Sequence, residues 1–263
     1  MSTLAKGRIA LVTGGTGAIG SEICRHLHDA GCAIAALGHP SEASRIAGWK
    51  QQLGFEAAVE LCDLGDFEAA GAAIRAIEAK LGAIEILVNA AGITRDARLV
   101  KMTPDQWNQV IAANLDSVFN ATKHVFEGMC TRGFGRIVNI TSSAVKAPID
   151  VLGLSNGARS GLTGFVAGVA RTNKLAAANV TINNLLPGAF DTDRLKATME
   201  GGAKKSGKTV EEIRDLRMKA IPSQRFGTPE EFGATCAFLC SAQAGYITGQ
   251  NVLTDGGAYP GTY

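Results

Sequence analysis

Short apolar runs alternate with longer amphipathic stretches along most of this chain. Runs typical of buried parallel strands lie at residues 9–12, 32–37, 57–63, 84–89, 136–140, 180–186 and 246–257. Helical patterns lie between them, among others at residues 66–81, 103–130 and 155–178, and Pro229 opens a last helix. Strands that alternate with helices form parallel sheets, so the pattern predicts an α/β fold. We expect one domain over residues 1–263, a doubly wound parallel sheet of seven strands in three layers.

Composition narrows the possible partners. The 263 residues are 46% apolar, which allows one large core, and the net charge of +2 provides no basic field for nucleic acid or an anionic membrane. No apolar run approaches the ~18 residues that span a bilayer, and the first seven residues lack the apolar core of a signal peptide. The six cysteines show no metal-ligand spacing. We therefore expect a cytoplasmic protein with a small-molecule substrate and no metal.

A glycine-rich turn follows the first apolar run. Gly15, Gly17 and Gly20 have the G-x-G-x-x-G spacing, between a strand and a helix that contains Ile23 and Leu27. Backbone N–H groups and the helix N-terminus can approach a pyrophosphate there, which makes the fold Rossmann-type; an ordinary glycine-rich turn is the alternative. The expected cofactor-binding residues of this turn are Gly14, Gly15, Thr16, Gly17, Ile19 and Gly20.

The end of the second strand bears on the choice of cofactor. An NAD site places Asp or Glu there on the adenosine ribose, whereas residues 38–41 read Gly-His-Pro-Ser. Without a carboxylate that repels a 2′-phosphate, NADP(H) is favoured over NAD(H), with His39, Ser41 or Arg45 as phosphate contacts. For Arg45, a solvated helix face is an equal alternative.

Three further segments are candidates for ligand contact. Residues 89–92 (Asn-Ala-Ala-Gly) end a buried strand with small side chains, which suits a flat ligand or a simple tight turn. Ser142 follows the strand at 136–140, at the sheet edge where open α/β folds bind ligands. Residues 191–221 are polar, with a Gly- and Lys-rich stretch at 201–207 between two helix-like pieces, and form either a lid or a surface excursion.

Taken together, these motifs resemble the short-chain dehydrogenase/reductase superfamily from about Lys6 to Gly257. Residues 13–20 resemble its cofactor turn, and 89–92 its Asn-Asn-Ala-Gly motif. The resemblance implies cofactor contacts at Asp63, Leu64, Asn89, Ala90, Ala91, Gly92, Pro187, Gly188 and Thr192, and catalytic roles for Asn114 and Ser142. Residues 91–96 and 107–111 look most like 3-oxoacyl thioester reductases, especially acetoacetyl-CoA reductases. A homotetramer or homodimer is implied, with the helices that hold Asn114 and Arg159 at the interface.

The chain departs from the family pattern at three places. Ala18 replaces a glycine, Ala90 replaces the second Asn, and Ser155 and Arg159 stand where the family has its Tyr and Lys, thirteen positions beyond Ser142. In the family, the tyrosine protonates the carbonyl oxygen as hydride arrives, and the lysine lowers the tyrosine pKa and holds the nicotinamide ribose. A serine hydroxyl is a far weaker acid than a phenol, and a guanidinium is not equivalent to an ammonium. The expected catalytic set is thus Ser142, Ser155, Arg159 and Asn114, with Arg159 also on the cofactor.

Two functions follow from this set. The first is an NADP(H)-dependent oxidoreductase that transfers hydride to or from a carbonyl or hydroxyl group, such as a 3-oxoacyl thioester. The second is a cofactor-binding protein with weak or no catalysis. For the reductase, water or Lys146 could relay the proton, or Tyr259 or Tyr263 of a neighbouring subunit could donate it.

Overall fold

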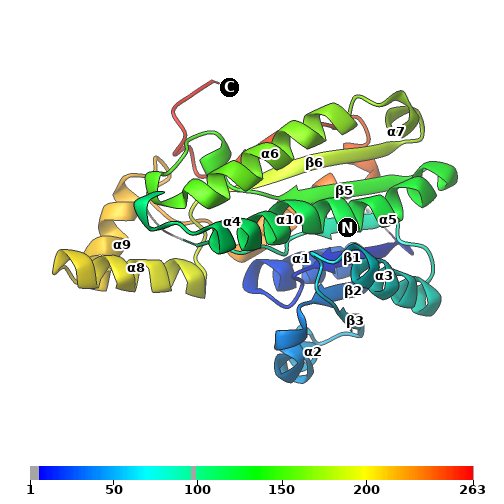
Figure 1. Cartoon of the computed structure of the whole chain (residues 1–263), viewed down its shortest axis with the longest axis horizontal. Helices are drawn as coiled ribbons and strands as arrows, with labels where there is room; N and C mark the ends of the chain where they lie inside the picture. Colours follow the sequence, from blue (N-terminus) through cyan, green and yellow to red (C-terminus); the bar gives the residue numbers. More distant parts are fainter. Residues whose placement is uncertain (1–5, 96–98, 263) are drawn as a thin grey trace.

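The computed structural model describes residues 6–95 and 99–262, and its centre is one parallel sheet (Figure 1). The sheet has seven strands in the order β3-β2-β1-β4-β5-β6-β7, which confirms the predicted fold. The order reverses direction between β1 and β4, so the carboxyl ends of these two strands flank a crevice. The strands are β1 (Ile9–Thr13), β2 (Ala33–Gly38), β3 (Ala57–Leu61), β4 (Ile86–Asn89), β5 (Gly135–Ile140), β6 (Val180–Pro187) and β7 (Asn251–Thr254).

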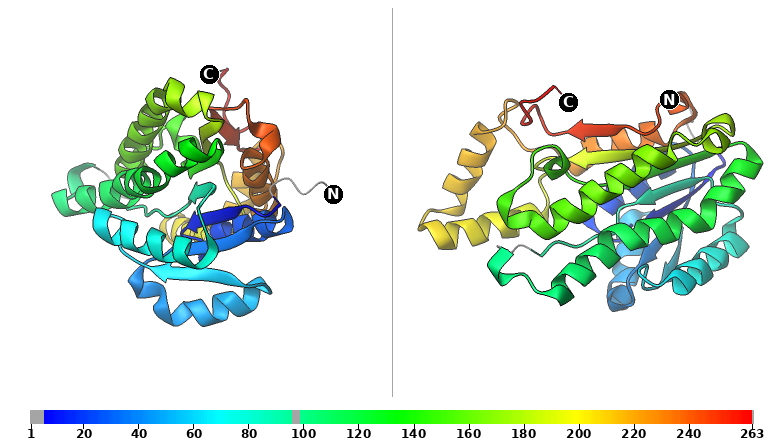
Figure 2. Two further views of the ribbon diagram at one scale, coloured as in Figure 1. Left: turned by 90° about the vertical axis from the view of Figure 1, so that its right-hand side faces the viewer. Right: turned by 45° about the horizontal axis from the view of Figure 1, so that its top comes forward.

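Helices cover both faces of the sheet and form the outer layers (Figure 2). The helices are α1 (Ala18–Asp29), α2 (Ile46–Leu53), α3 (Phe67–Leu81), α4 (Pro104–Ile111), α5 (Ser117–Arg132), α6 (Gly153–Val169), α7 (Asn173–Ala177), α8 (Asp193–Ser206), α9 (Val210–Lys219) and α10 (Pro229–Leu239). Successive β1 residues alternate between two cores: Val12 packs in the cluster with α1 and α10, and Leu11 in the cluster with α3, α5 and α6. Strands buried on both faces explain why the sequence shows continuous apolar runs.

Three element boundaries differ from the sequence prediction. The helix expected over 155–178 is two helices, because Thr172, a weak helix former, has an extended backbone conformation and α7 starts after it at Asn173. The strand expected over 246–257 contracts to β7, because Gly249 and Gly256 have positive φ values of 71° and 66°.

The polar segment 191–221 is mostly helical. Its glycine-rich stretch was expected between two helical pieces, but residues 201–206 form the last turns of α8, which ends at Gly207 with a φ of 70°. Thr209 then caps α9. In Figure 1, α8 and α9 project beyond the sheet at the edge where β6 ends.

Candidate active site

The turn between β1 and α1 depends on missing side chains. Gly14 has a φ of 64°, and a Cβ there would lie 2.8 Å from Ala91. A Cβ on Gly20 would lie 2.8 Å from the Cα of Gly15, so α1 packs directly on the loop. Gly17 precedes the first turn of α1, whose N–H groups have no partner within the helix. This glycine cradle fits a pyrophosphate at the helix N-terminus.

A cleft of about 300 Å³ opens beside this turn. Its walls come from the carboxyl ends of several strands and from the start of α5, which is the place expected for a dinucleotide in an open α/β sheet. Of the residues predicted to bind cofactor, eight line it: Gly14, Gly17, His39, Asp63, Leu64, Ala90, Ala91 and Gly92.

The loop after β3 is held by two short hydrogen bonds. The Asp63 carboxylate accepts from the N–H of Gly65 over 2.9 Å, and the Asn120 side chain donates to the carbonyl of Leu64 over 2.9 Å. Asp63 and Leu64, both expected to contact the cofactor, therefore lie on a fixed loop.

A carboxylate that the sequence reading missed stands at the ribose end of the cleft. Glu42 lines the cleft, and its side chain accepts from the hydroxyl of Thr16 over 2.8 Å and from the N–H of His39 over 3.3 Å. The premise that no acid stands after β2 is therefore wrong, because a capping box folds Glu42 back toward the strand end. Ser41 is held beside His39, with 2.8 Å between its hydroxyl and Nδ1.

Several predicted cofactor residues lie behind the cleft. Ile19 packs against the core, and Asn89 is buried in the sheet with its amide on Asn139 over 2.9 Å. The side chain of Asn89 thus supports the strand and does not line the cleft, because its amide is held by Asn139 of the neighbouring strand β5.

The predicted residues after β6 also lie outside the cleft. Gly188 packs against Asp255, where a Cβ would lie 2.6 Å from that of Asp255. The hydroxyl of Thr192 accepts from the N–H of Leu195 over 3.3 Å and caps α8. Together with Pro187, they connect the sheet edge to the helical segment 191–221.

Asn114 holds the segment that follows β4. A π-helical turn, Ala112–Asp116, joins α4 to α5, and Asn114 within it is 1% exposed. Its amide donates to the carbonyl of Ile93 over 2.8 Å and its Oδ1 accepts from the N–H of Ile93 over 3.1 Å. Such π turns occur often at functional sites.

Arg159 connects three elements of the site. From α6 its guanidinium donates to the Ser155 hydroxyl over 3.2 Å, to the carbonyl of Ile140 over 2.8 Å and to Oδ1 of Asn114 over 3.3 Å. Burial, with a smaller contribution from the charge of Arg194, lowers the pKa of Arg159 to about 10. The group therefore remains a cation at neutral pH.

The two serines keep their hydroxyl protons available. Ser142 accepts from the N–H of Ala144 over 3.1 Å, and Ser155 accepts from Nε of Arg159. Because each oxygen already accepts an N–H, each O–H can donate to a further acceptor. The predicted catalytic residues Asn114, Ser155 and Arg159 thus form one hydrogen-bonded group, and Ser142 stands at the end of the neighbouring strand β5.

The candidate proton donors meet on one loop. Lys146 ends the turn after Ser142, and its ammonium lies 5.7 Å from the ring centroid of Tyr259 in the same chain. Tyr259 therefore reaches this loop within its own chain, whereas the prediction brought it from a neighbouring subunit. Tyr263 lies outside the described residues.

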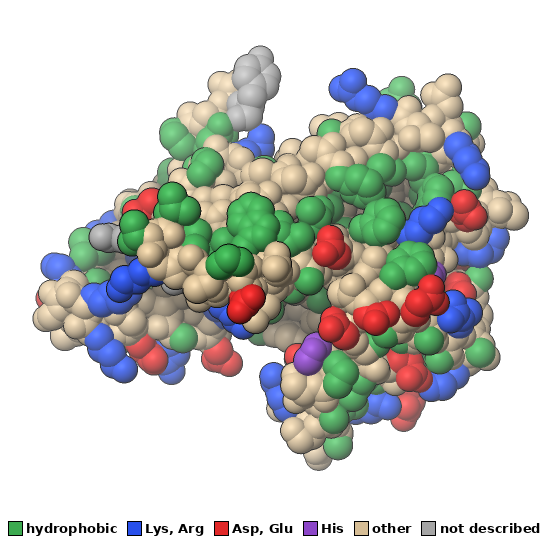
Figure 3. Space-filling view, in the orientation of Figure 1, with side chains coloured by type: hydrophobic (Ala, Val, Ile, Leu, Met, Phe, Trp, Pro, Cys, Tyr) green, Lys and Arg blue, Asp and Glu red, His purple; other side chains and the backbone are tan. Residues whose placement is uncertain are grey.

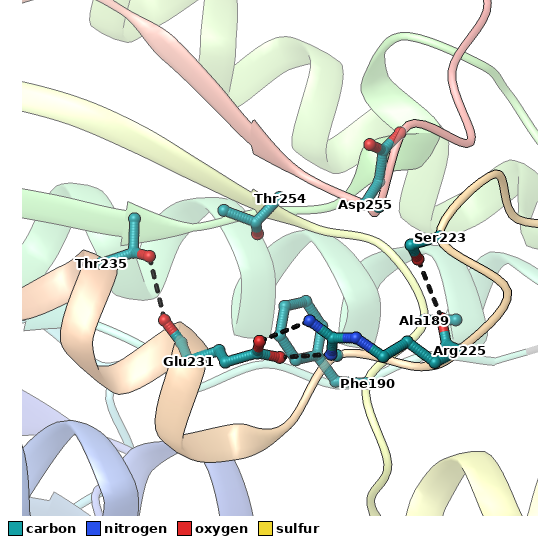
Figure 4. A pocket seen from close by; sticks show the side chains of 10 residues that line it. Ala189, Phe190, Ser223, Arg225, Glu231, Thr235, Thr254 and Asp255 are labelled. Carbon is teal, nitrogen blue, oxygen red and sulfur yellow. Dashed lines mark hydrogen bonds and ion pairs between the residues drawn. The ribbon is translucent and has the colours of Figure 1, made fainter.

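A second hollow, of about 190 Å³, lies between the ends of β6 and β7 and the start of α10 (Figure 4). Its one arginine, Arg225, forms two hydrogen bonds with the Glu231 carboxylate, over 2.8 and 2.6 Å. The paired charge provides no free cation for a phosphate, so we place the cofactor in the larger cleft.

The described residues offer neither a metal site nor a membrane-spanning helix. Across residues 6–95 and 99–262, no group of three His, Cys, Asp or Glu side chains is arranged to hold a metal ion. None of the helices in this part of the chain combines the length and apolarity that crossing a bilayer needs.

Comparisons with known proteins identify the family. Residues 15–259 match the family described as enoyl-(acyl carrier protein) reductase. An acetoacetyl-CoA reductase of Allochromatium vinosum is 40% identical over 96% of this chain and 98% of its own length. NAD⁺-bound xylitol dehydrogenase superimposes with a TM-score of 0.86 at 26% identity, covering 96% of this chain and 99% of that one. An NADPH-dependent reductase involved in bacilysin biosynthesis superimposes with a TM-score of 0.87 at 25% identity, covering 95% and 98%.

These similarities extend over almost the whole chain and agree with the parallel sheet and the glycine turn described above. The chain is an oxidoreductase that uses a nicotinamide cofactor, and it belongs to the short-chain dehydrogenase/reductase superfamily.

Proposed function

We propose that this enzyme reduces the 3-oxo group of a small acyl substrate, with Ser155, Arg159, Asn114 and Ser142 as its site. The hydrogen-bonded group of Arg159, Ser155 and Asn114, next to Gly92 of the 300 Å³ cleft, is the observation that carries the proposal. The similarity to an acetoacetyl-CoA reductase supports the acyl substrate.

The bound nicotinamide supplies hydride to the carbonyl carbon. The chain's part is to stabilise the negative charge that develops on the carbonyl oxygen and to deliver a proton to it. The hydroxyls of Ser142 and Ser155 donate hydrogen bonds to that oxygen. Arg159 donates to the Ser155 oxygen and so polarises its O–H bond.

The proton that ends on the substrate oxygen needs a source with a lower pKa than serine. Lys146 stands four residues beyond Ser142 and is half-buried, so it can return a proton to Ser142 or Ser155 through water. Tyr259, which lies beside Lys146, is the second donor that we consider.

We propose that the cofactor is NADP(H). The NADPH-dependent structural neighbour supports this choice, and so do His39 and Ser41 at the end of the cleft next to β2. Glu42 opposes it, because its carboxylate lies where a 2′-phosphate would approach. We expect the two effects to leave the affinities for NADPH and NADH within about tenfold of each other, a difference of about 1.4 kcal/mol.

We also propose that residues 191–221 cover the substrate end of the cleft and that the protein works as a dimer or tetramer. A hydrogen bond of 2.7 Å from Arg194 of α8 to Thr94 supports the lid, because Thr94 follows the cleft residues Gly92 and Ile93. A cytoplasmic location stays a prediction.

Dinucleotide binding and turnover test the proposal separately. We expect the natural protein to bind NADPH and to oxidise it when acetoacetyl-CoA is added. Ser155→Ala should lower kcat by about 10²-fold and leave the NADPH Kd unchanged, because a general acid is worth about 10²- to 10⁴-fold. The matched control is Ser160→Ala, an exposed serine of the same helix.

A second comparison decides between an enzyme and a binding protein. The double variant Ser155→Tyr with Arg159→Lys restores the family pair. If only this variant turns over any carbonyl substrate, the natural chain binds the cofactor without catalysis. Equal turnover by Ser155→Ala and the natural protein would remove Ser155 from the mechanism.

A further inference from the structure

Arg159 is a buried cation without an anionic partner. Arg159 is only 9% exposed. Its guanidinium donates to a hydroxyl, a backbone carbonyl and an amide oxygen, and all three acceptors are neutral. Among residues 6–95 and 99–262, no carboxylate forms an ion pair with it. Burying a charge is costly unless an opposite charge accompanies it, so the site as built favours an incoming anion.

The guanidinium has the donors to hold one. Arginine carries five N–H groups in a planar fork, and three of them are used by Ser155, Ile140 and Asn114. The other two belong to Nη1 and Nη2, each of which makes one of these hydrogen bonds. A carboxylate can accept from both, in the paired geometry that arginine and carboxylate groups prefer.

Gly92 lies between the cleft and this fork. A Cβ at Gly92 would lie 3.1 Å from Nη2 of Arg159 and 2.5 Å from Oδ1 of Asn114. Gly92 also lines the cleft, so only backbone separates the cleft from the guanidinium on this side. A larger residue at position 92 would collide with this group.

A second cation contacts the same segment. Arg194 donates to the hydroxyl of Thr94, two residues beyond Gly92, over 2.7 Å. Its positive charge contributes, after burial, to the lowered pKa of Arg159. Among the described residues, Arg194 has no ion pair either. Two like charges near one segment repel each other until an anion lies between them.

We propose that Arg159 and Arg194 bind the carboxylate of the substrate, and that the enzyme acts on a free 3-oxo carboxylate and its 3-hydroxy counterpart in place of the thioester. The inference rests on the proposed reductase function. The two oxygens of the carboxylate take the open donors of Arg159, while the 3-oxo group two carbons away lies by the hydroxyl of Ser155. Arg194 makes the site favourable for the anion from the side of α8.

Acetoacetate and methyl acetoacetate form a matched pair of probes, because they carry the same 3-oxo group and differ in the negative charge. With saturating reduced cofactor, we expect acetoacetate to have a kcat/KM at least tenfold above that of the neutral ester. In calorimetry on the protein with cofactor, acetoacetate should bind and the ester should bind at least tenfold more weakly. Equal values for the two probes would overturn the inference.

The variant Arg194→Gln tests the second cation. We expect it to raise KM for acetoacetate about tenfold more than KM for methyl acetoacetate, because the contact of Arg194 with Thr94 serves both probes equally. Lys196→Gln, which removes an exposed positive charge from the same helix, should change neither. A loss shared equally by both probes, or by both variants, would contradict a specific role for Arg194.

Failure of this inference differs from failure of the proposed function. If acetoacetyl-CoA is reduced and acetoacetate does not bind, the reductase proposal stands and the carboxylate site is wrong. If neither NADPH nor NADH binds, the proposed function itself is wrong. If acetoacetate binds without turnover, the carboxylate site stands and the proposed catalysis by Ser155 is wrong.

Discussion

Glu42 takes part both in a helix cap and in the cofactor cleft. As the third residue of a 3₁₀ turn, it accepts from the N–H of His39, and the same carboxylate accepts from Thr16 in the glycine turn. The cap therefore directs a negative charge toward the ribose site even though Glu42 lies four residues beyond the last residue of β2. The charge at this position, and not the length of the side chain, should therefore control the affinity for a cofactor that carries a 2′-phosphate.

We predict that Glu42→Gln increases the affinity for NADPH relative to NADH by about tenfold, because the amide retains the hydrogen bond to Thr16 and removes the repulsion of the phosphate. Fluorescence titration of both reduced cofactors gives the ratio of the two Kd values. Glu56→Gln removes an exposed carboxylate elsewhere and should leave the ratio as it is. An unchanged ratio in Glu42→Gln would mean that the carboxylate turns away when cofactor binds.

The limits of sequence reasoning at this scale have a physical cause. Asn114 was expected from the family resemblance and Ser142 from its place after the strand at 136–140, and their catalytic roles stay predictions; the glycine turn is fixed by local backbone geometry. The arrangement of Arg159 was not predictable, because its partners Ile140 and Asn114 lie 19 and 45 residues away. Glu42 was detectable, since a Pro followed two residues later by Glu is a helix-start signal, but its direction into the cleft depends on Thr16.

At the scale of elements, the alternation of strands and helices predicted the sheet well, since strands buried on both faces leave a strong apolar signal. Two of the boundaries that failed, at residues 201–207 and 249–256, lie where glycine is involved. Gly201 and Gly202 sit inside α8, where packing of Met199 and Ala203 on the neighbouring elements outweighs their low helix propensity. Tertiary contacts of that kind are absent from the local pattern.

A row of asparagines connects four neighbouring strands at the carboxyl side of the sheet. Asn89, Asn139, Asn184 and Asn251 are register partners in β4 to β7. Each donates its amide to the next in line, over 2.9, 3.1 and 2.8 Å. The row lies next to the segments that hold Gly92 and Ser142, so it fixes the spacing of the strands beneath the active site.

We predict that Asn139→Ala, at the centre of this row, lowers the free energy of unfolding by about 1–3 kcal/mol, because the buried amide of Asn89 and the buried amide oxygen of Asn184 each lose their hydrogen bond to it. Urea denaturation measures this loss. Asn251→Ala, at the exposed end of the row, removes only the hydrogen bond from Asn184, so it should lower the free energy of unfolding less. Equal losses in the two variants would show that the row does not act through buried, unpaired amides.

At the scale of the whole molecule, one face carries exposed aromatic side chains. Trp107 of α4, Phe119 of α5 and Phe165 of α6 are 50%, 46% and 38% exposed, and the rings of Phe119 and Phe165 pack edge to face with centroids 6.3 Å apart. Figure 3 shows hydrophobic side chains gathered over this face. Clustered aromatic residues on a surface are typical of protein interfaces. The helices α4 and α5 flank the turn that holds Asn114, and α6 holds Arg159. The family resemblance implies an interface at these helices.

We predict that this face joins two copies of the chain, and that Phe119→Glu lowers the oligomeric state because a charge placed opposite its own copy is buried without a partner. Light scattering at several concentrations should show a dimer or tetramer for the natural protein and a smaller species for the variant. Leu216→Glu, at a 52% exposed position on α9, should retain the natural size. A monomeric natural protein would contradict the prediction. If dissociation of the subunits also lowers kcat while the cofactor still binds, the interface helps to hold α5 and α6 in place, and with them Asn114 and Arg159.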